Sequence, residues 1–303
     1  MRADGRRTRN ILPLYEVATH FMSRRSDAQN MLTIDIPLEP IKNYLNAKKK
    51  EGIRLSHMGL FLAAYVRTLS EYPEINRFVV NRKIYSRNEI AVGMVVLKSG
   101  DSSDETMSKM YFDVDDNVFE VERKIQEYVD ENRQAGDTNS TDGILKVLLR
   151  IPFLCGFAIK FFKLLDRYGM LPKAVLDMSP FHESLLISNL ASIRANHIYH
   201  HAYDFGTTSL TMTMGNMRYV PVIKNGEQVF ERTIPVGIVM DDRVATGVIY
   251  SKAFRRFREL LKNPQLLEEK PETVKLDFEN QYEKQKKRLQ KIKAKQRAKA
   301  RKK

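Results

Sequence analysis

The chain has 303 residues, of which 43% are hydrophobic and 29% are charged, as is usual for a globular protein with a substantial core. Its only cysteine, Cys155, excludes an intrachain disulfide and favours a reducing, cytoplasmic setting. The net charge of +14 comes from the C-terminal end, because residues 284–303 hold 12 Lys or Arg and no acid. The rest holds 39 basic and 37 acidic residues and is therefore nearly neutral.

The N-terminal half predicts a mixture of helices and strands. Residues 1–11 are basic, show no hydrophobic signal sequence, and predict a flexible segment. After them, hydrophobic periodicity and turn residues predict a helix over 14–23, a strand over 31–38, a helix over 40–50, a buried helix over 57–72, two short strands around Asn81 and Arg82, strands over 90–97 and 110–114, and a helix over 118–133.

The C-terminal half continues this mixture after a polar loop or linker at 135–143. Because strands and helices do not alternate regularly, we expect an α/β sandwich with a mixed β-sheet flanked by helices. The predicted elements are strands over 185–190, 207–214 and 219–223, a hairpin turn at Asn225-Gly226, a strand over 234–240, and an amphipathic helix with apolar residues from 250 to 261.

The most apolar part of the chain, 144–171, is interrupted by charged residues. Its longest uncharged run, 151–159, falls short of the roughly 20 residues that a membrane-spanning helix needs. We therefore predict no transmembrane segment. A pair of amphipathic core helices, with Cys155 buried, is the first interpretation, and a helix lying on a membrane surface is the alternative.

The C-terminal segment 278–303 is rich in Glu, Gln, Lys, Arg and Ala and has no apolar stripe. It predicts a basic tail that is loosely helical or disordered. The tail is either a solvated extension or a binding segment for nucleic acid or an anionic surface through residues 284–303. It has no interleaved aromatic residues, which argues against specific base stacking.

Several stretches resemble, in order, the catalytic domain of the dihydrolipoyl acyltransferases of 2-oxo acid dehydrogenase complexes, a family that shares its fold with chloramphenicol acetyltransferase. The resemblance implies a chloramphenicol acetyltransferase-like two-layer sandwich over 12–277, free-standing, forming a homotrimer with active sites at subunit interfaces. It also implies coenzyme A or acyl-coenzyme A as substrate. The matching stretches are Leu32 to Ile36, Tyr72 to Asn76, Leu186 to Leu190, Pro221 to Glu227, Asp241 to Gly247, Phe254, and Leu260 to Pro264.

In this family a His-x-x-x-Asp-Gly turn supplies the general base, and a Ser or Thr hydroxyl stabilises the tetrahedral oxyanion. By this resemblance Ser188 matches the oxyanion-stabilising serine, and Asn189 matches its neighbour. Gly247 matches the motif glycine, so we assign Asn189 and Gly247 to binding of the coenzyme A thioester. The histidine position is occupied by Asp242 and the aspartate position by Thr246.

The exchange of histidine for Asp242 weakens the predicted base. A thiol has a pKa of about 8.5, histidine about 6.5 and aspartate about 3.9. Proton transfer from a thiol is therefore uphill by roughly 2.7 kcal/mol to histidine and by roughly 6 kcal/mol to aspartate. Burial raises an aspartate pKa and recovers part of this difference. The alternative is that Asp242, with Arg243, forms an interface ion pair or a turn cap.

A second source of a base is the cluster that contains His197, His200 and His201. We predict that His200 or His201 projects into the interface channel and replaces the missing histidine. A polar surface or hydrogen-bond cluster is one alternative. A metal site that also uses Asp204 is another, but the chain offers no further ligands, so we predict no metal.

The sequence thus predicts an acyl-coenzyme A-dependent acyltransferase whose activity is weakened, repurposed or lost. The alternative is a non-catalytic trimeric binding or scaffold protein whose basic tail holds an anionic partner.

Overall fold

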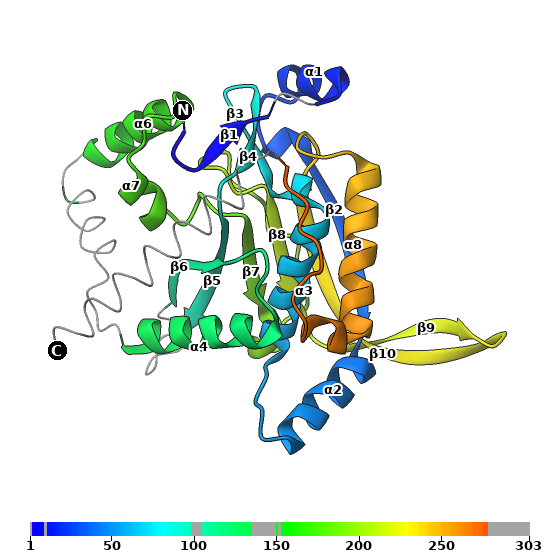
Figure 1. Ribbon diagram of the computed structural model, residues 1–303. Coiled ribbons are helices and arrows are strands. Elements are labelled where there is room, and N and C mark those ends of the chain that lie inside the picture. Colours follow the sequence, from blue (N-terminus) through cyan, green and yellow to red (C-terminus); the bar gives the residue numbers. More distant parts are fainter. Residues whose placement is uncertain (1, 9–10, 98–104, 135–149, 151–152, 278–303) are drawn as a thin grey trace.

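The computed structural model describes residues 2–8, 11–97, 105–134, 150 and 153–277 (Figure 1). Its larger sheet is mixed: β5, β7 and β8 run parallel, and the other neighbours run antiparallel. The strands in spatial order are β2 (Gln29–Pro37), β10 (Glu227–Asp241), β8 (Leu210–Met214), β7 (Leu185–Asn189), β5 (Ile90–Leu97) and β6 (Glu105–Phe112), with β9 (Arg218–Lys224) paired to the first half of β10.

Helices α3 (His57–Glu71) and α8 (Gly247–Lys262) cover one face of this sheet (Figure 1). The sequence of α3 is apolar almost all round, and nearly the whole helix is buried. Ser56 caps α3 by accepting a hydrogen bond from the Gly59 N–H at 2.9 Å. The buried residues of α8 follow the helical period and join α3 and the sheet in one core: Tyr250, Ala253, Phe254, Phe257, Leu260 and Leu261.

The other elements of this layer pack around α3 and α8. Helix α2 packs near the end of α8, and α4 packs against α3 and β6. Their bounds and those of the short 3-10 helices are α2 (Leu38–Lys50), α4 (Val118–Gln134), η1 (Ser26–Ala28), η2 (Pro73–Asn76), η3 (Leu190–Ile193) and η4 (Pro264–Leu267).

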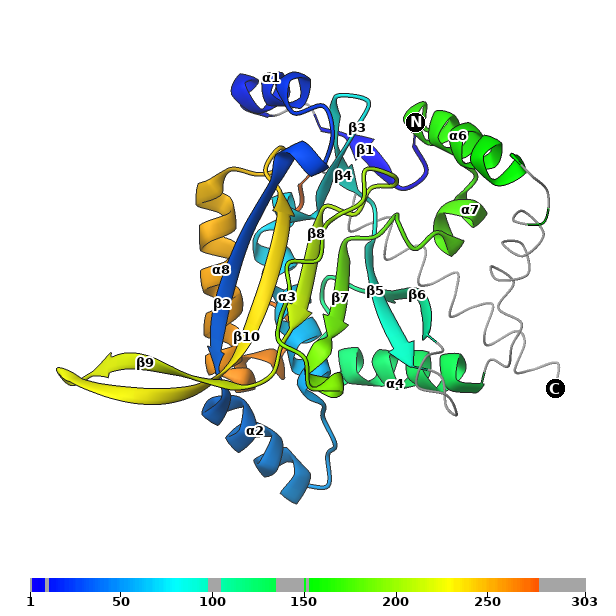
Figure 2. The same ribbon diagram turned by 180° about the vertical axis from the view of Figure 1, so that it is seen from behind.

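The opposite face of the sheet is shown in Figure 2, with α3 and α8 behind the strands. Across β8, β10 and β2 this face carries an extended segment, 196–204, and no described helix. Helix α7 (Lys173–Met178) packs against β6 on this side, where Lys109 Nζ donates to the Leu176 carbonyl. The predicted two-layer α/β sandwich is therefore confirmed.

The prediction of a flexible segment over 1–11 is wrong for the described residues. Strand β1 (Gly5–Arg7) pairs antiparallel with β4 (Lys83–Arg87), which pairs with β3 (Arg77–Val80) in a small second sheet. Arg2 and Asp4 are buried, because the Arg2 guanidinium binds Asp4 and the distant Asp166. The folded body therefore begins before residue 12.

The prediction of core helices within 144–171 is wrong for the part described. Helix α6 (Leu154–Arg167) lies at the edge of the molecule (Figure 1), with Phe157 68% exposed and Cys155 half-buried. Within the described ranges no helix is both long and apolar enough to cross a membrane. The predicted loop at 135–143 and the tail at 278–303 lie outside the described residues.

Candidate functional site

Ser188 lies near the end of β7, in a row of residues that crosses the sheet. Ser188 pairs with Thr213, Thr213 with Gly237, and Gly237 with Thr33. Residues paired in this way have their side chains on the same face of a sheet, here the face opposite α3 and α8. Within the described ranges the Ser188 hydroxyl makes no hydrogen bond, and the residue is half-buried. It is therefore available to a ligand.

Asp242 follows the last residue of β10 and faces the helical layer. Its N–H donates to the Ala28 carbonyl at 2.8 Å, which fixes the turn. Burial raises the pKa of Asp242, and the neighbouring Asp241 charge raises it further, whereas a hydrogen bond from Asn30 opposes the shift. The side chain lines a mainly apolar cavity of about 470 Å³, together with Asn30, Leu32, Ile34, Met240, Gly247, Tyr250, Ser251, Phe254, Arg255 and Arg258.

A single chain does not bring Ser188 and Asp242 together. The Ser188 row meets β10 at Gly237, and Asp242 lies five residues further on. At about 3.3 Å per residue this is roughly 16 Å along the strand, and two strand spacings add roughly 10 Å across the sheet. The two side chains also lie on opposite faces. A site that uses both residues therefore needs a second subunit.

The two predicted thioester-binding residues follow the same division. Asn189 lies beside Ser188, is exposed, and its carbonyl accepts a hydrogen bond from the Ser192 hydroxyl at 2.6 Å. Gly247 lies beside Asp242 at the start of α8 and lines the same cavity. Thr246 caps α8 by accepting a hydrogen bond from the Ile249 N–H at 3.2 Å. The motif threonine therefore supports the helix.

Arg243 pairs with Asp241 and not with Asp242, contrary to the ion pair that we considered from the sequence. The Arg243 guanidinium donates to the two Asp241 carboxylate oxygens at 2.8 and 2.6 Å. Arg25 Nε lies 3.6 Å from the same carboxylate, and burial lowers the pKa of Arg25. All three side chains are buried. This cluster, which the sequence reasoning missed, fixes the turn, and among the described residues Asp242 forms no ion pair with an arginine.

The histidine cluster extends along the open face of the sheet. His197 lies closest to the Ser188 row, since its ring packs over Gly237 and its Nε2 lies 3.0 Å from the Thr33 hydroxyl. Burial lowers the pKa of His197, and the Arg218 charge lowers it further. His200 Nδ1 contacts the carbonyl of His201, and His201 is exposed.

No hydrogen bond joins any of these rings to Ser188 or Asp242 among the residues described. In the same ranges no group of three or more His, Cys, Asp or Glu side chains is placed to hold a metal ion. The histidines that we assigned as bases are therefore separate from both halves of the site within one subunit.

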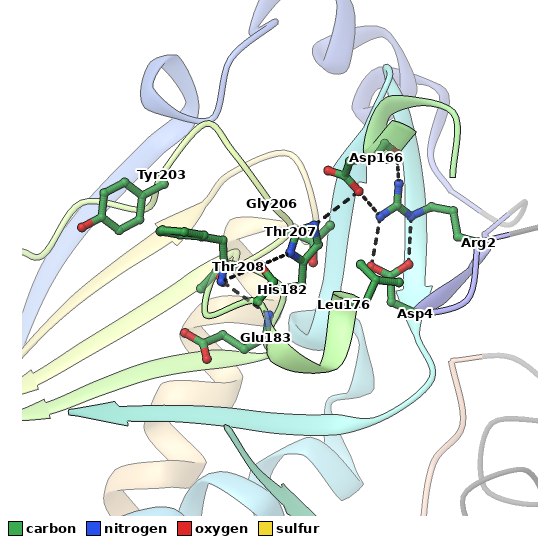
Figure 3. A network of polar contacts seen from close by, with 12 residues as sticks. Arg2, Asp4, Asp166, Leu176, His182, Glu183, Tyr203, Gly206, Thr207 and Thr208 are labelled. Carbon is green, nitrogen blue, oxygen red and sulfur yellow. Dashed lines mark hydrogen bonds and ion pairs between the residues drawn. The ribbon is translucent and has the colours of Figure 1, made fainter. Parts of the chain in front are cut away.

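A buried polar network joins Arg2, Asp4, Asp166 and His182 (Figure 3). His182 Nδ1 lies 2.7 Å from the Ser179 hydroxyl, and its Nε2 lies 3.3 Å from Asp166. Burial alone raises the pKa of Asp166, but the His182 hydrogen bond and the Arg2 charge outweigh it and lower the pKa. Arg2 also binds Asp4 through two hydrogen bonds, at 2.9 and 3.0 Å.

This network contains the serine, histidine and aspartate of a hydrolytic triad, but it does not face a cavity that could hold a substrate. The cavity beside His182 has a volume of about 10 Å³, enough for no more than one water molecule. Ser179 does not line this cavity, and the Asp166 carboxylate accepts a hydrogen bond from Arg2. The network therefore attaches the N-terminal strand to α6 and the loop that precedes β7.

Similar solved structures have the fold of dihydrolipoamide acyltransferase cores. A "probable dihydrolipoamide acetyltransferase" from Listeria monocytogenes has a TM-score of 0.54 and 14% identity, over 85% of this chain and 95% of its own. The cubic core of a pyruvate dehydrogenase multienzyme complex has a TM-score of 0.55 and 13% identity, over 86% and 92%. A dihydrolipoamide acetyltransferase from Azotobacter vinelandii has 0.54 and 12%, over 84% and 88%.

No protein-family model and no curated protein matches the chain. The solved structures confirm the predicted acyltransferase-like fold, and their coverage extends to most of the chain.

Proposed function

We propose that this protein is an acyltransferase that uses a coenzyme A thioester in the cytoplasm, with active sites formed between the subunits of a homotrimer. The observation that carries the proposal is the division of the candidate site into a Ser188 half and an Asp242 half. Each half is accessible, yet one chain cannot join them. An acyltransferase-core fold with a divided site fits a site shared by two subunits.

The similar structures support this interpretation. The Azotobacter vinelandii acetyltransferase was studied for the role of a serine, a histidine and an asparagine in its catalytic mechanism. That histidine and asparagine are four positions apart, which is also the spacing of Asp242 and Thr246. The cubic core of the pyruvate dehydrogenase complex is an assembly of subunits. Both features agree with a subunit-shared site in this chain.

Exposed apolar side chains offer a surface for self-association. The hairpin of β9 and β10 projects from the sheet (Figure 2), and Tyr219, Ile223 and Phe230 on it are exposed. Burying such side chains against a second subunit removes apolar area from water and stabilises the assembly. We therefore place this hairpin in the trimer contact.

In the proposed reaction an acceptor thiol or hydroxyl attacks the thioester carbonyl carbon and gives its proton to the Asp242 carboxylate. The Ser188 hydroxyl donates a hydrogen bond to the tetrahedral oxyanion. The carbonyl re-forms as the C–S bond breaks, and the coenzyme A thiolate leaves and takes up the proton. The raised pKa of Asp242 reduces the uphill cost of proton transfer from the acceptor to this carboxylate.

The second candidate is a non-catalytic trimeric scaffold. It is favoured by the use of Thr246 as a helix cap and by the lack of any imidazole contact with Ser188 in the described part of the chain. In this case the cavity at Asp242 binds a ligand without turnover, and the tail 284–303 binds nucleic acid or an anionic surface. Salt-sensitive binding that disappears when the chain ends at residue 277 tests the tail.

Turnover of acetyl-coenzyme A with a dithiol acceptor, combined with thermal shift by coenzyme A, tests the two candidates. An acyltransferase is stabilised by coenzyme A and loses about 10²-fold in turnover on Ser188→Ala or Asp242→Asn. The exposed Ser23→Ala and Asp27→Asn variants serve as controls and keep wild-type turnover. A thermal shift without turnover for any thioester supports the scaffold. Absence of both effects contradicts a coenzyme A site.

A further inference from the structure

Two helices at one end of the molecule expose apolar side chains. Helix α1 (Pro13–Phe21) and α6 lie on either side of the β3–β4 hairpin in both views (Figures 1 and 2). On α1 the exposed residues Leu14, Val17 and Phe21 follow the helical period, and Phe21 is 82% exposed. The inner side of α1 is anchored by Thr19, which is buried and donates to the Arg82 carbonyl. The outer side has no described partner.

The exposed side of α6 has two adjoining stripes. One is basic, with Lys160, Lys163 and Arg167 at positions i, i+3 and i+7. The only acid of α6, Asp166, points inward and is bound by Arg2. The other stripe is apolar and consists of Phe153, at the residue before the helix, with Phe157, Phe161, Leu164 and Tyr168, all exposed.

A basic cavity of about 330 Å³ lies between α6, the β3–β4 hairpin and the chain around residue 24. The carboxylates at its wall, Asp166 and Asp204, are already bound by Arg2 and by Ser26. Among the described residues Arg24, Arg82, Lys163 and Arg167 have no ion-pair partner and are exposed. The cationic residues of the wall are Arg24, Arg25, Arg82, Lys163, Arg167 and Arg243.

The hairpin turn presents one of these cations in an unfavourable backbone conformation. Arg82 has φ 57°, in the left-handed region that favours glycine. An arginine therefore occupies a turn position for which glycine is the better residue, and its side chain lines the basic cavity. Such a conformation is often retained where a side chain has a binding role.

We propose that this end of the molecule, the α1–α6 face, binds the surface of an anionic phospholipid membrane. Its apolar part is the two exposed helix stripes, and its basic part is the cavity with Arg24, Arg82, Lys163 and Arg167. Apolar side chains enter the headgroup–acyl boundary, and the cavity binds a lipid phosphate. This inference does not depend on acyl transfer.

The combination of apolar and basic residues on the α1–α6 face favours an anionic membrane as its binding partner. A surface that joins an apolar stripe to unpaired cations fits a partner with negative charge at its rim and hydrocarbon beneath it. The exposed phenylalanines of α6 suit the apolar side of a membrane interface, and Tyr168 after the helix suits its hydrated side through the hydroxyl group. The free carboxylates that a cationic partner would require are missing from the described α6 surface.

Co-sedimentation of the full chain with vesicles tests the proposal. Vesicles of phosphatidylcholine with phosphatidylglycerol are compared with pure phosphatidylcholine vesicles. We expect salt-sensitive binding to the anionic vesicles only. Lys163→Gln with Arg167→Gln lowers the partition coefficient by about 25-fold, at about fivefold for each cation. Phe157→Ser with Phe161→Ser lowers it by at least about tenfold.

Lys252→Gln with Lys262→Gln on α8 removes the same charge from two exposed residues elsewhere and leaves binding unchanged. Circular dichroism and thermal unfolding confirm that each variant is folded, and light scattering measures its oligomeric state. The proposal is overturned by absence of binding, or by binding that the α6 variants do not reduce, as when the tail alone is responsible. It is also overturned if only soluble inorganic phosphate binds, or if the aromatic variant changes the oligomeric mass without affecting vesicle binding.

Discussion

Ser188 and Asp242 lie on opposite faces of one sheet. Ser188 is two strands away from β10, in a row of residues that meets β10 at Gly237, and Asp242 follows five residues after Gly237. Strand geometry makes this separation rigid, because β8 and β10 are paired without interruption from Val236 opposite Met214 to Met240 opposite Leu210. No loop movement within one subunit closes it. A reaction that uses both residues therefore depends on how the subunits assemble.

If the site is shared between subunits, two inactive variants restore activity when mixed. In trimers assembled at random from equal amounts of Ser188→Ala and Asp242→Asn chains, about a quarter of the interfaces combine an intact serine with an intact aspartate. We expect about a quarter of wild-type acetyl transfer after co-expression, measured by release of coenzyme A. Mixed variants that stay as inactive as their parents would place the two residues in separate roles.

Introducing the His-x-x-x-Asp-Gly motif of the dihydrolipoyl acyltransferases is expected to raise activity. Asp242→His supplies a base whose pKa is closer to that of a thiol, and Thr246→Asp keeps the cap of α8, because aspartate is also a good N-cap residue. We expect acetyl transfer by the double variant to rise by about 10²-fold. Thr246→Asp alone serves as the control and has little effect. A fall in activity would mean that Asp242 performs a task that histidine cannot.

The buried N-terminal ion pairs are expected to contribute strongly to stability. Arg2→Met leaves Asp4 and Asp166 with less compensation in a buried site, which costs about 3 kcal/mol in the free energy of unfolding. Arg7→Met is the matched control, since Arg7 pairs with Glu16 at 3.2 Å on the surface and contributes less than about 1 kcal/mol. Urea unfolding measures both. Equal, small losses would mean that the N-terminal segment is only loosely attached.

Hydrophobic periodicity predicted the elements that build the core. The all-round apolar pattern of residues 57–72 and the stripe from Tyr250 to Leu261 gave α3 and α8, and the capping residue Ser56 was also identified. These features are local, because each depends on side chains within a few turns of one another. The hairpin around Asn81 and Arg82 is equally local.

The features that the sequence did not reveal depend on distant partners. The N-terminal residues looked loose because Asp166, which binds Arg2, is 164 positions away. The pattern of α6 showed an amphipathic helix but not whether anything covers it. Asp241 and Asp242 are adjacent in the chain, and only the strand register decides that Asp241 binds Arg25 and Arg243 while Asp242 lines the cavity.

Glu183 is expected to make the stability of the protein depend on pH. It is fully buried, and among the described residues neither carboxylate oxygen has a hydrogen-bond partner. Burial raises its pKa from 4.5 to about 8, whereas the charges of Lys109 and Arg87 oppose the shift. Between these two values the folded protein keeps the proton that the unfolded chain loses, so the free energy of unfolding falls as pH rises from about 4.5 to about 8. Below about pH 4.5 Glu183 is protonated in both the folded and the unfolded protein, so it does not oppose folding.

Glu183→Gln removes this dependence, because a neutral amide replaces the carboxyl group. We expect the variant to gain stability relative to the wild type as pH rises from 5 to 8, by on the order of 3 kcal/mol. Chemical unfolding at several pH values measures the difference, in which the titrating groups that do not interact with Glu183, such as buried His182, cancel. Glu131→Gln, at an exposed position, is the control and gives a flat difference. A flat difference for Glu183→Gln as well would show that Lys109 keeps Glu183 ionised in the folded protein.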